Sequence, residues 1–174
     1  PLLHDRVVVE AWGDPSPKFR AAPAVTGHRL GPVHRRGKYL LVDAAHEGHR
    51  RELVVHLGMT GQLGVHLDPT GSHVRAWWRL ADGSTLVLRD VRRFGRVAVV
   101  DAGDHASLPT LAALGPEPFD DAFTGAALHC SLTASRLRVK THLLSQRPVA
   151  GVGNIYADEA LWRAGINPAA RRVG

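Results

Sequence analysis

The sequence predicts an α+β protein with two domains, an N-terminal antiparallel β-sandwich followed by a helical domain. Short apolar stretches with strand-like alternation, separated by turn residues, occupy most of residues 1–119. Beyond residue 120 the apolar residues recur at helical spacing instead. A proline-rich segment, 114–119, lies between the two patterns and breaks regular structure. We therefore expect domains at 1–119 and 120–174.

The first domain reads as a series of short strands. We expect them at 6–12, 37–42, 52–57, 62–66, 73–80, 84–89 and 95–100. Residues 81–83 end in Asp-Gly, which suits a tight hairpin turn between two of these strands. The polar, proline-containing segment 14–23 is expected to be a loop, and 105–114 a short helix.

The second domain reads as helical. Its core side is expected to carry apolar residues spaced along one face, Leu128, Leu132, Val139 and Leu143. A second stripe would carry Leu137 and Leu144. The pattern predicts amphipathic helices that bury one side.

Residues 148–161 read as a tight glycine turn that leads into a further helix. Gly151 and Gly153 permit a close approach of another group to the backbone. Asn154 occupies the expected N-cap position. The exposed N–H groups of such a helix start suit a phosphate, and an ordinary helix cap is the alternative. The basic helix expected just upstream favours phosphate, because 122–157 contains no acidic residue.

The overall composition limits the function. A net charge of +6 and a pI of about 10.4 favour an acidic partner. No apolar run approaches membrane-spanning length, so no membrane association is expected. The single cysteine, Cys130, cannot form an internal disulfide or a zinc site, and we expect it to be a small core residue.

Three short clusters could carry chemistry. The first is 28–38, in which Lys38 stands among other cations at a strand start. Lys38 could serve as a nucleophile or proton carrier, and a solvated basic edge strand is the alternative. The second, 56–61, places Met59, the only methionine, at the tip of a glycine-bounded turn. Met59 could insert into a base stack, or fill the core beneath the hairpin.

The third cluster is 90–96. In an extended strand, Arg92 and Phe94 would point to the same side. A cation and a ring together could fill a hole in a duplex and stack on an orphaned base. A β-turn with solvated arginines and a buried Phe94 is the alternative.

Five segments, taken in order, resemble the bacterial formamidopyrimidine-DNA glycosylase family. They are 38–41, 56–61, 92–95, 114–118 and 151–157. Endonuclease VIII relatives share the glycine turn and usually lack Arg-Arg-Phe-Gly, so the chain is more similar to the oxidised-purine branch. The resemblance implies a helix–two-turn–helix in the second domain. It also implies excision of 8-oxoguanine and formamidopyrimidines by base flipping, followed by lyase cleavage of the abasic site.

The resemblance also assigns roles to residues. Lys38 is similar to the catalytic lysine that assists β-elimination. The positions that fill the vacated space correspond to Met59, Arg92 and Phe94. Phosphate-holding positions correspond to His56, Lys140 and Asn154. Two further DNA contacts are expected at His73 and Arg136, where the sequence departs from the family pattern. Near His73, Gly71 stands where the family often has a second histidine. Beside Arg136, Ser135 stands where the family often has a basic residue.

The two ends depart from the family pattern. Pro1 is followed by leucine where the family has a glutamate, and 1–38 is too short to hold the family's first helix. We therefore expect that Pro1 is not the nucleophile, that this chain does not excise 8-oxoguanine, and that slow Lys38-dependent abasic cleavage remains available. The family's zinc finger would follow residue 174, so no cofactor is expected in this chain.

The expected partner is double-stranded DNA with a damaged base or abasic site, bound by a monomer in the bacterial cytoplasm at the nucleoid. A non-catalytic homologue that binds damaged DNA is the alternative function.

Overall fold

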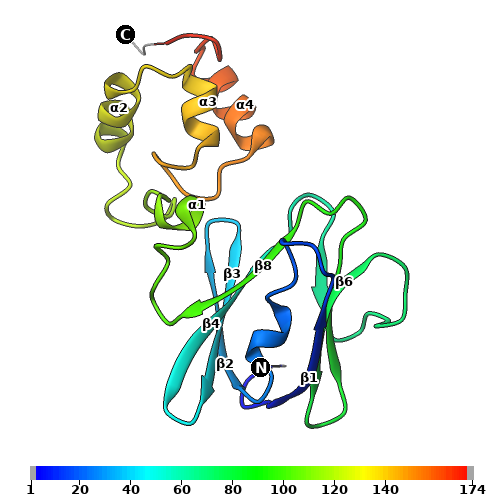
Figure 1. Cartoon of the computed structure of the whole chain (residues 1–174). Coiled ribbons are helices and arrows are strands. Elements are labelled where there is room, and N and C mark those ends of the chain that lie inside the picture. Colours follow the sequence, from blue (N-terminus) through cyan, green and yellow to red (C-terminus); the bar gives the residue numbers. More distant parts are fainter. Residues whose placement is uncertain (1–2, 172–174) are drawn as a thin grey trace. The chain divides into compact units, whose positions relative to one another are not determined.

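The computed structural model describes residues 3–171, which separate into two compact units (Figure 1). The β unit comprises the residues up to Arg35 together with Tyr39–Ser107. The helical unit comprises Arg36–Lys38 and the residues from Leu108 onward. The units divide after Ser107, earlier than the joint expected at 114–119. Pro1, which we expect not to be the nucleophile, lies outside the described residues.

The β unit is built from two four-stranded sheets, which confirms the predicted α+β class. One sheet has the order β1 (Val8–Gly13), β6 (Val74–Leu80), β7 (Thr85–Arg89) and β5 (Gln62–Gly64). The other has the order β2 (Arg29–Arg36), β3 (Tyr39–His46), β4 (His49–His56) and β8 (Arg96–Asp101). The β6–β7 hairpin turns at the predicted Asp-Gly.

One strand, β2, was predicted only as the alternative for 28–38. It carries three arginines and a histidine and lacks the apolar alternation that predicts the other strands. β2 lies at the edge of its sheet, where outward side chains are solvated and charge discourages pairing with other chains. The alternative interpretation of 28–38, a solvated basic edge strand, is therefore confirmed for Arg29–Arg36.

The core of the β unit lies between the sheets. Trp78, Phe19 and Leu53 are among its fully buried members. A short 3-10 helix, η1 (Ala22–Val25), contacts strands of both sheets, and Trp78 Nε1 donates to the carbonyl of Ala22 at 2.9 Å. The predicted loop before η1 thus contributes Phe19 to the core, because apolar residues interrupt its polar pattern.

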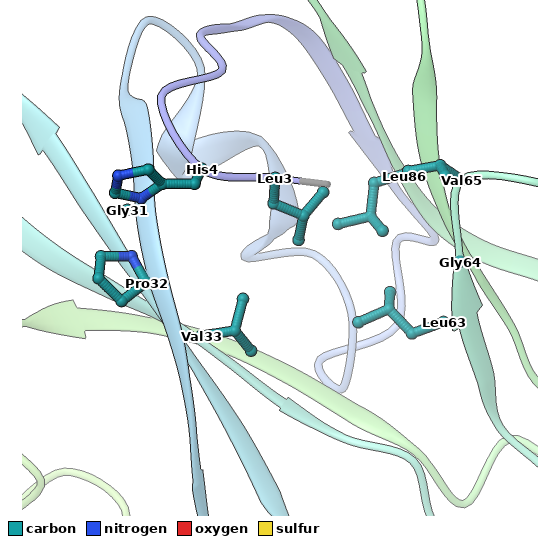
Figure 2. A pocket seen from close by; sticks show the side chains of 9 residues that line it. All are labelled: Leu3, His4, Gly31, Pro32, Val33, Leu63, Gly64, Val65 and Leu86. Carbon is teal, nitrogen blue, oxygen red and sulfur yellow. The ribbon is translucent and has the colours of Figure 1, made fainter. Parts of the chain in front are cut away.

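An apolar cavity of about 600 Å³ opens between β2 and β5 in the β unit (Figure 2). Its lining is Leu3, His4, Gly31, Pro32, Val33, Leu63, Gly64, Val65 and Leu86. None of the predicted DNA-contact residues lines it.

The helical unit contains α1 (Pro109–Ala112), α2 (Gly125–Ala134), α3 (Val139–Leu144) and α4 (Asn154–Arg163). The predicted apolar face is confirmed, since Leu132, Val139 and Leu143 are buried together. Leu137 is exposed, because it lies in the connection between α2 and α3. Among residues 3–171, no helix has the length and apolar character needed to cross a membrane.

Cys130 is exposed, so its prediction as a core residue was wrong. The core side of α2 carries Leu128 and Leu132, which are four residues apart. Cys130 lies midway between them in sequence and therefore points to the opposite side of the helix.

Candidate nucleic-acid interface

Two loops of the β unit meet backbone to backbone. The first, 57–61, follows β4, and the second, 90–95, precedes β8, which pairs with β4. Gly58 has a φ of 66°, and a β-carbon there would lie 2.7 Å from the carbonyl carbon of Phe94. Only glycine fits this position. The contact places Met59, the next residue, beside the loop that carries Phe94.

The tips of both loops are exposed. Met59 is 72% exposed and Phe94 is 52% exposed, so neither fills the core as the alternative interpretations required. The guanidinium carbon of Arg92 lies 5.3 Å from the centre of the Phe94 ring, within the range of a cation–π contact. Arg92 and Phe94 are therefore grouped, as predicted.

The reason for this grouping differs from the one predicted. Residues 91–93 form a bend rather than an extended strand, and Arg93 has a left-handed φ of 57°. Strand alternation therefore does not align Arg92 and Phe94. The bend does so by turning the intervening Arg93 away from them, toward Asp14.

The carboxylate of Asp90 anchors both loops. Asp90 is fully buried and accepts hydrogen bonds from the hydroxyl of Thr60 and the amide of Gly95, each at 2.6 Å. Burial alone would raise the pKa of Asp90. The bonds from Thr60, Gly95 and the amides of Arg92 and Phe94 outweigh it, and the pKa lies below the ordinary value.

A second carboxylate, Asp14, holds Arg93. The Arg93 guanidinium donates to both carboxylate oxygens at 2.7 and 2.6 Å, and Arg75 approaches one of them at 3.5 Å. Burial would raise the pKa of Asp14. The amide of Ser16 and the two guanidiniums lower it further than burial raises it. Asp14 and Asp90 were not predicted as functional, and the only sequence signal was that Asp14 precedes an acid-free stretch.

The two predicted histidines lie at the same end of the β unit. His56 ends β4, and its Nδ1 accepts from the amide of Gly58 at 3.1 Å. With Nδ1 accepting, the neutral ring carries its proton on Nε2. His73 is exposed, and its carbonyl accepts from the amide of Asp90 at 2.9 Å. The structure thus brings together five predicted residues, His56, Met59, His73, Arg92 and Phe94.

In the helical unit, the turn that carries Lys38 is fixed by Glu117. The Glu117 carboxylate accepts from the amide of Gly37 at 2.6 Å and from Arg36 at 3.1 Å. Arg36 also donates to the carbonyls of Leu114 and Gly115. Gly37 has a φ of 55°, and a β-carbon there would lie 2.9 Å from Leu114. The predicted Leu-Gly-Pro-Glu segment therefore anchors the turn that presents Lys38.

The amine of Lys38 lies against the glycine turn. A β-carbon at Gly153 would be 2.9 Å from Lys38 Nζ, so the bare backbone makes room for the amine. The turn is held by Gly151, whose amide donates to Gln146 at 2.9 Å. Lys38 remains exposed.

The N-cap prediction for Asn154 was wrong by one residue. Gly153 is the N-cap, in extended backbone, and Asn154 is the first residue of α4. Glycine has no side chain to cap the helix, and no side-chain cap bond is present. The amides of the first turn are therefore left to an external acceptor, which suits the predicted phosphate.

Lys140 and Arg136 occupy different settings. Lys140, in α3, binds both carboxylate oxygens of Asp158 in α4, at 2.7 and 2.9 Å. Asp158 lies one turn beyond Asn154. Arg136 is exposed in the connection between α2 and α3, so only part of the predicted basic helix is helical, the part in α3 that carries Lys140. Within residues 3–171, no described contact joins Arg136 to Lys38, Lys140 or Asn154.

Among residues 3–171, no group of three or more His, Cys, Asp or Glu side chains could hold a metal ion. The zinc that the family resemblance implies therefore has no ligand set in this part of the chain, and the expected lack of a cofactor stays a prediction.

Comparison with known proteins identifies the family of this chain. A family model described as the formamidopyrimidine-DNA glycosylase N-terminal domain matches residues 2–97. The formamidopyrimidine-DNA glycosylase H2TH domain matches residues 114–172. The chain belongs to the formamidopyrimidine-DNA glycosylase family, and the predicted resemblance is confirmed.

Named relatives agree with this assignment. The formamidopyrimidine-DNA glycosylase of Deinococcus radiodurans is 47% identical over 99% of this chain and 62% of its own length. The crystal structure of MutM (Fpg) from Thermus thermophilus has a TM-score of 0.84 and 42% identity, over 98% of this chain and 62% of that one. A Lactococcus lactis Fpg in complex with abasic-site DNA has a TM-score of 0.78 and 29% identity, over 97% and 64%. The chain thus spans less than two thirds of these relatives.

Proposed function

We propose that this chain belongs to a DNA glycosylase that excises 8-oxoguanine and formamidopyrimidines from duplex DNA and cleaves the resulting abasic site. The observation that carries the proposal is the Lys38 amine held beside Gly153 and the uncapped start of α4. It puts an exposed amine next to a place for a phosphate. The glycosylase names of the relatives favour an enzyme over the non-catalytic alternative.

Lys38 is the amine proposed for abasic-site cleavage. A phosphate on the first-turn amides of α4 would bring the sugar of the same nucleotide toward Nζ. The amine attacks C1′ of the open-chain sugar and forms a Schiff base with loss of water. Removal of a C2′ proton then expels the 3′ phosphate, which completes β-elimination. An exposed amine at this position suits the attack, because it is reachable from solvent.

The exposed side chains of the β unit are proposed to fill the space left by the flipped nucleotide. Met59 supplies an apolar wedge, and the Phe94 ring with Arg92 offers a stacking surface for the orphaned base. Their exposure and grouping support this role. The remaining predicted contacts hold phosphates, namely His56, His73, Arg136, Lys140 and Asn154.

The proposed partner is double-stranded DNA containing a damaged base or an abasic site. Relatives solved with 8-oxo-G, Fapy-dG or abasic-site DNA support this choice. We further propose a monomer that works in the bacterial cytoplasm at the nucleoid, without a cofactor in residues 1–174.

Borohydride trapping tests the proposal. The reagent reduces a Schiff base to a stable covalent adduct, so adduct yield reports attack on C1′. We expect the chain to form an adduct with abasic-site duplex, and Lys38→Ala to lower its yield about a hundredfold because the attacking group is removed.

Lys140→Ala is the matched control, since it removes a lysine from the same unit without removing the proposed nucleophile. Its adduct yield should recover when the protein concentration is raised, because only binding is weakened. An unchanged yield with Lys38→Ala would reject the role of Lys38. An adduct with 8-oxoguanine duplex that survives Lys38→Ala would identify another amine, Pro1 included, as the nucleophile.

A further inference from the structure

The two exposed tips of the β unit come from separate parts of the chain. Met59 belongs to the loop after β4, and Phe94 to the loop before β8. The contact of Gly58 with the backbone of Phe94 brings the two loops together, and a bond between the loops would fix the spacing of their tips more firmly. The exposed side chains do not provide it, because they project to solvent.

One side-chain hydrogen bond joins the two loops. The Thr60 hydroxyl donates to Oδ1 of Asp90 at 2.6 Å, across thirty positions of sequence. The other oxygen of Asp90 accepts from the amide of Gly95 at 2.6 Å, within its own loop. Asp90 therefore stabilises its own loop, 90–95, through Oδ2 and binds the neighbouring loop, 57–61, through Oδ1.

The Asp90 end of this connection is rigid. Its side chain is fully buried, and its carbonyl accepts from Nε of Arg75 at 2.9 Å. Its amide donates to the carbonyl of His73 at 2.9 Å. Thr60 directly follows Met59 in the sequence. The bond between Thr60 and Asp90 therefore restrains the backbone next to the wedge residue.

We propose that Thr60 and Asp90 are a positioning pair that sets the spacing of Met59 and Phe94 and thereby the preference of the protein for DNA with a missing base. The inference rests on the proposed function. Both side chains must occupy one hole at the same time, and loops that move independently lose part of their contact when they are ordered on binding. Intact duplex offers no hole, so its binding does not need the fixed spacing.

Thr60→Val tests the pair, because valine keeps the shape of threonine and removes the hydroxyl. The chain offers a matched control in Thr70→Val. The Thr70 hydroxyl donates to Asp68 at 2.7 Å within one exposed turn, so its loss leaves the two loops joined. Thr60→Ser restores a hydroxyl and should restore the function. If Thr60→Val does not fold, Thr60→Ala takes its place.

The measured quantity is the ratio of Kd for undamaged duplex to Kd for the same duplex with a tetrahydrofuran abasic analogue. We expect Thr60→Val to lower this ratio about fivefold, with binding to undamaged duplex changed less than about twofold. Thr60→Ser and Thr70→Val should match the wild type. In a Phe94→Ala background, Thr60→Val should change the ratio no further, since the side chain being positioned is already absent.

The outcomes separate this inference from the proposed function. A wild-type preference for the abasic duplex that survives Thr60→Val overturns the positioning pair alone. An equal loss with Thr70→Val overturns it as well, because the effect would not depend on joining the loops. Equal binding of the two duplexes by the wild type overturns the proposed function and this inference with it.

Discussion

The β unit and the helical unit hold their candidate residues in different ways. In the β unit, two carboxylates with little exposure, Asp14 and Asp90, fix loops whose tips are apolar or aromatic. In the helical unit, the Glu117 carboxylate holds the turn that carries Lys38, and bare glycine backbone beside it leaves the amine and the start of α4 uncovered. The first arrangement resists displacement of side chains, whereas the second leaves the exposed Lys38 amine and the uncapped helix start accessible to an anion.

This difference suggests a division of labour on DNA. Cations and helix-start amides contact phosphates, which every duplex offers, so the helical unit is expected to supply affinity. Wedge and stacking side chains need a hole in the duplex, so the β unit is expected to supply discrimination in addition to the phosphate contacts proposed for His56 and His73. The predictions below test each side of this comparison, beginning with the largest effect.

Salt should weaken DNA binding strongly. The helical unit offers two predicted phosphate-contacting cations, Arg136 and Lys140, which give a slope of about −1.8 in log K against log salt. Affinity for undamaged duplex should therefore fall about twelvefold between about 50 and 200 mM salt. A gel-shift titration at both concentrations measures this.

Two variants refine the salt prediction. Lys140→Ala should reduce the slope by about 0.9, since one phosphate contact is lost. Arg79→Ala removes a positive charge from the β unit, where Arg79 pairs with Glu10, and should leave the slope unchanged. Equal affinity at both salt concentrations would reject the electrostatic account.

Gly153→Ala should displace the Lys38 amine while the fold is retained. The backbone at 153 is extended, so alanine is tolerated, and the new β-carbon meets only the flexible end of Lys38. Adduct yield with abasic duplex should fall about tenfold, because misplacement of a reacting group is costly. Gly125→Ala, which faces open space at the start of α2, is the control. A wild-type adduct yield with Gly153→Ala would contradict the claim that the glycine turn positions the Lys38 amine.

The buried carboxylate of Asp90 should make stability depend on acid pH. Its folded-state pKa is lowered, so its stabilising effect is present above the unfolded value and is lost as pH falls through the folded pKa. The melting-temperature difference between wild type and Asp90→Asn should therefore narrow from about pH 5 to pH 2. A constant difference for Asp90→Asn would contradict the lowered pKa.

The smallest effect concerns Asp158. This carboxylate holds Lys140, so Asp158→Asn should free the ammonium for phosphate and raise affinity about threefold at low salt. Glu159→Gln changes the net charge equally, but Glu159 pairs with Arg163 instead. Binding measured at one salt concentration distinguishes the two. Equal gains would mean that net charge, and not Lys140, is responsible.

Local signals predicted much of the fold. Alternation and the Asp-Gly turn located β6 and β7, and helical spacing located the core of the helical unit. The prediction failed where a charged edge strand, β2, carries no apolar alternation. Asn154 was misplaced by one position, because a glycine N-cap has no side-chain signal.

The site was predictable only in part. Motif residues such as Met59 and Phe94 were identified, and the structure groups them at one end of the β unit. Their supports were not identified, because Asp90 acts through Thr60 and Asp14 through Arg93, far away in sequence. Contacts of that kind depend on which strands become neighbours, and local sequence patterns do not encode this.

The division of labour is tested most directly by comparing Phe94→Ala with Lys140→Ala at one salt concentration, using abasic-analogue and undamaged duplexes. Phe94→Ala should lower the preference for the abasic duplex about tenfold and leave undamaged binding nearly unchanged, since only a hole admits the ring. Lys140→Ala should weaken both duplexes by the same factor and keep the preference. The opposite pattern, a preference that is lost with Lys140→Ala and kept with Phe94→Ala, would contradict the account.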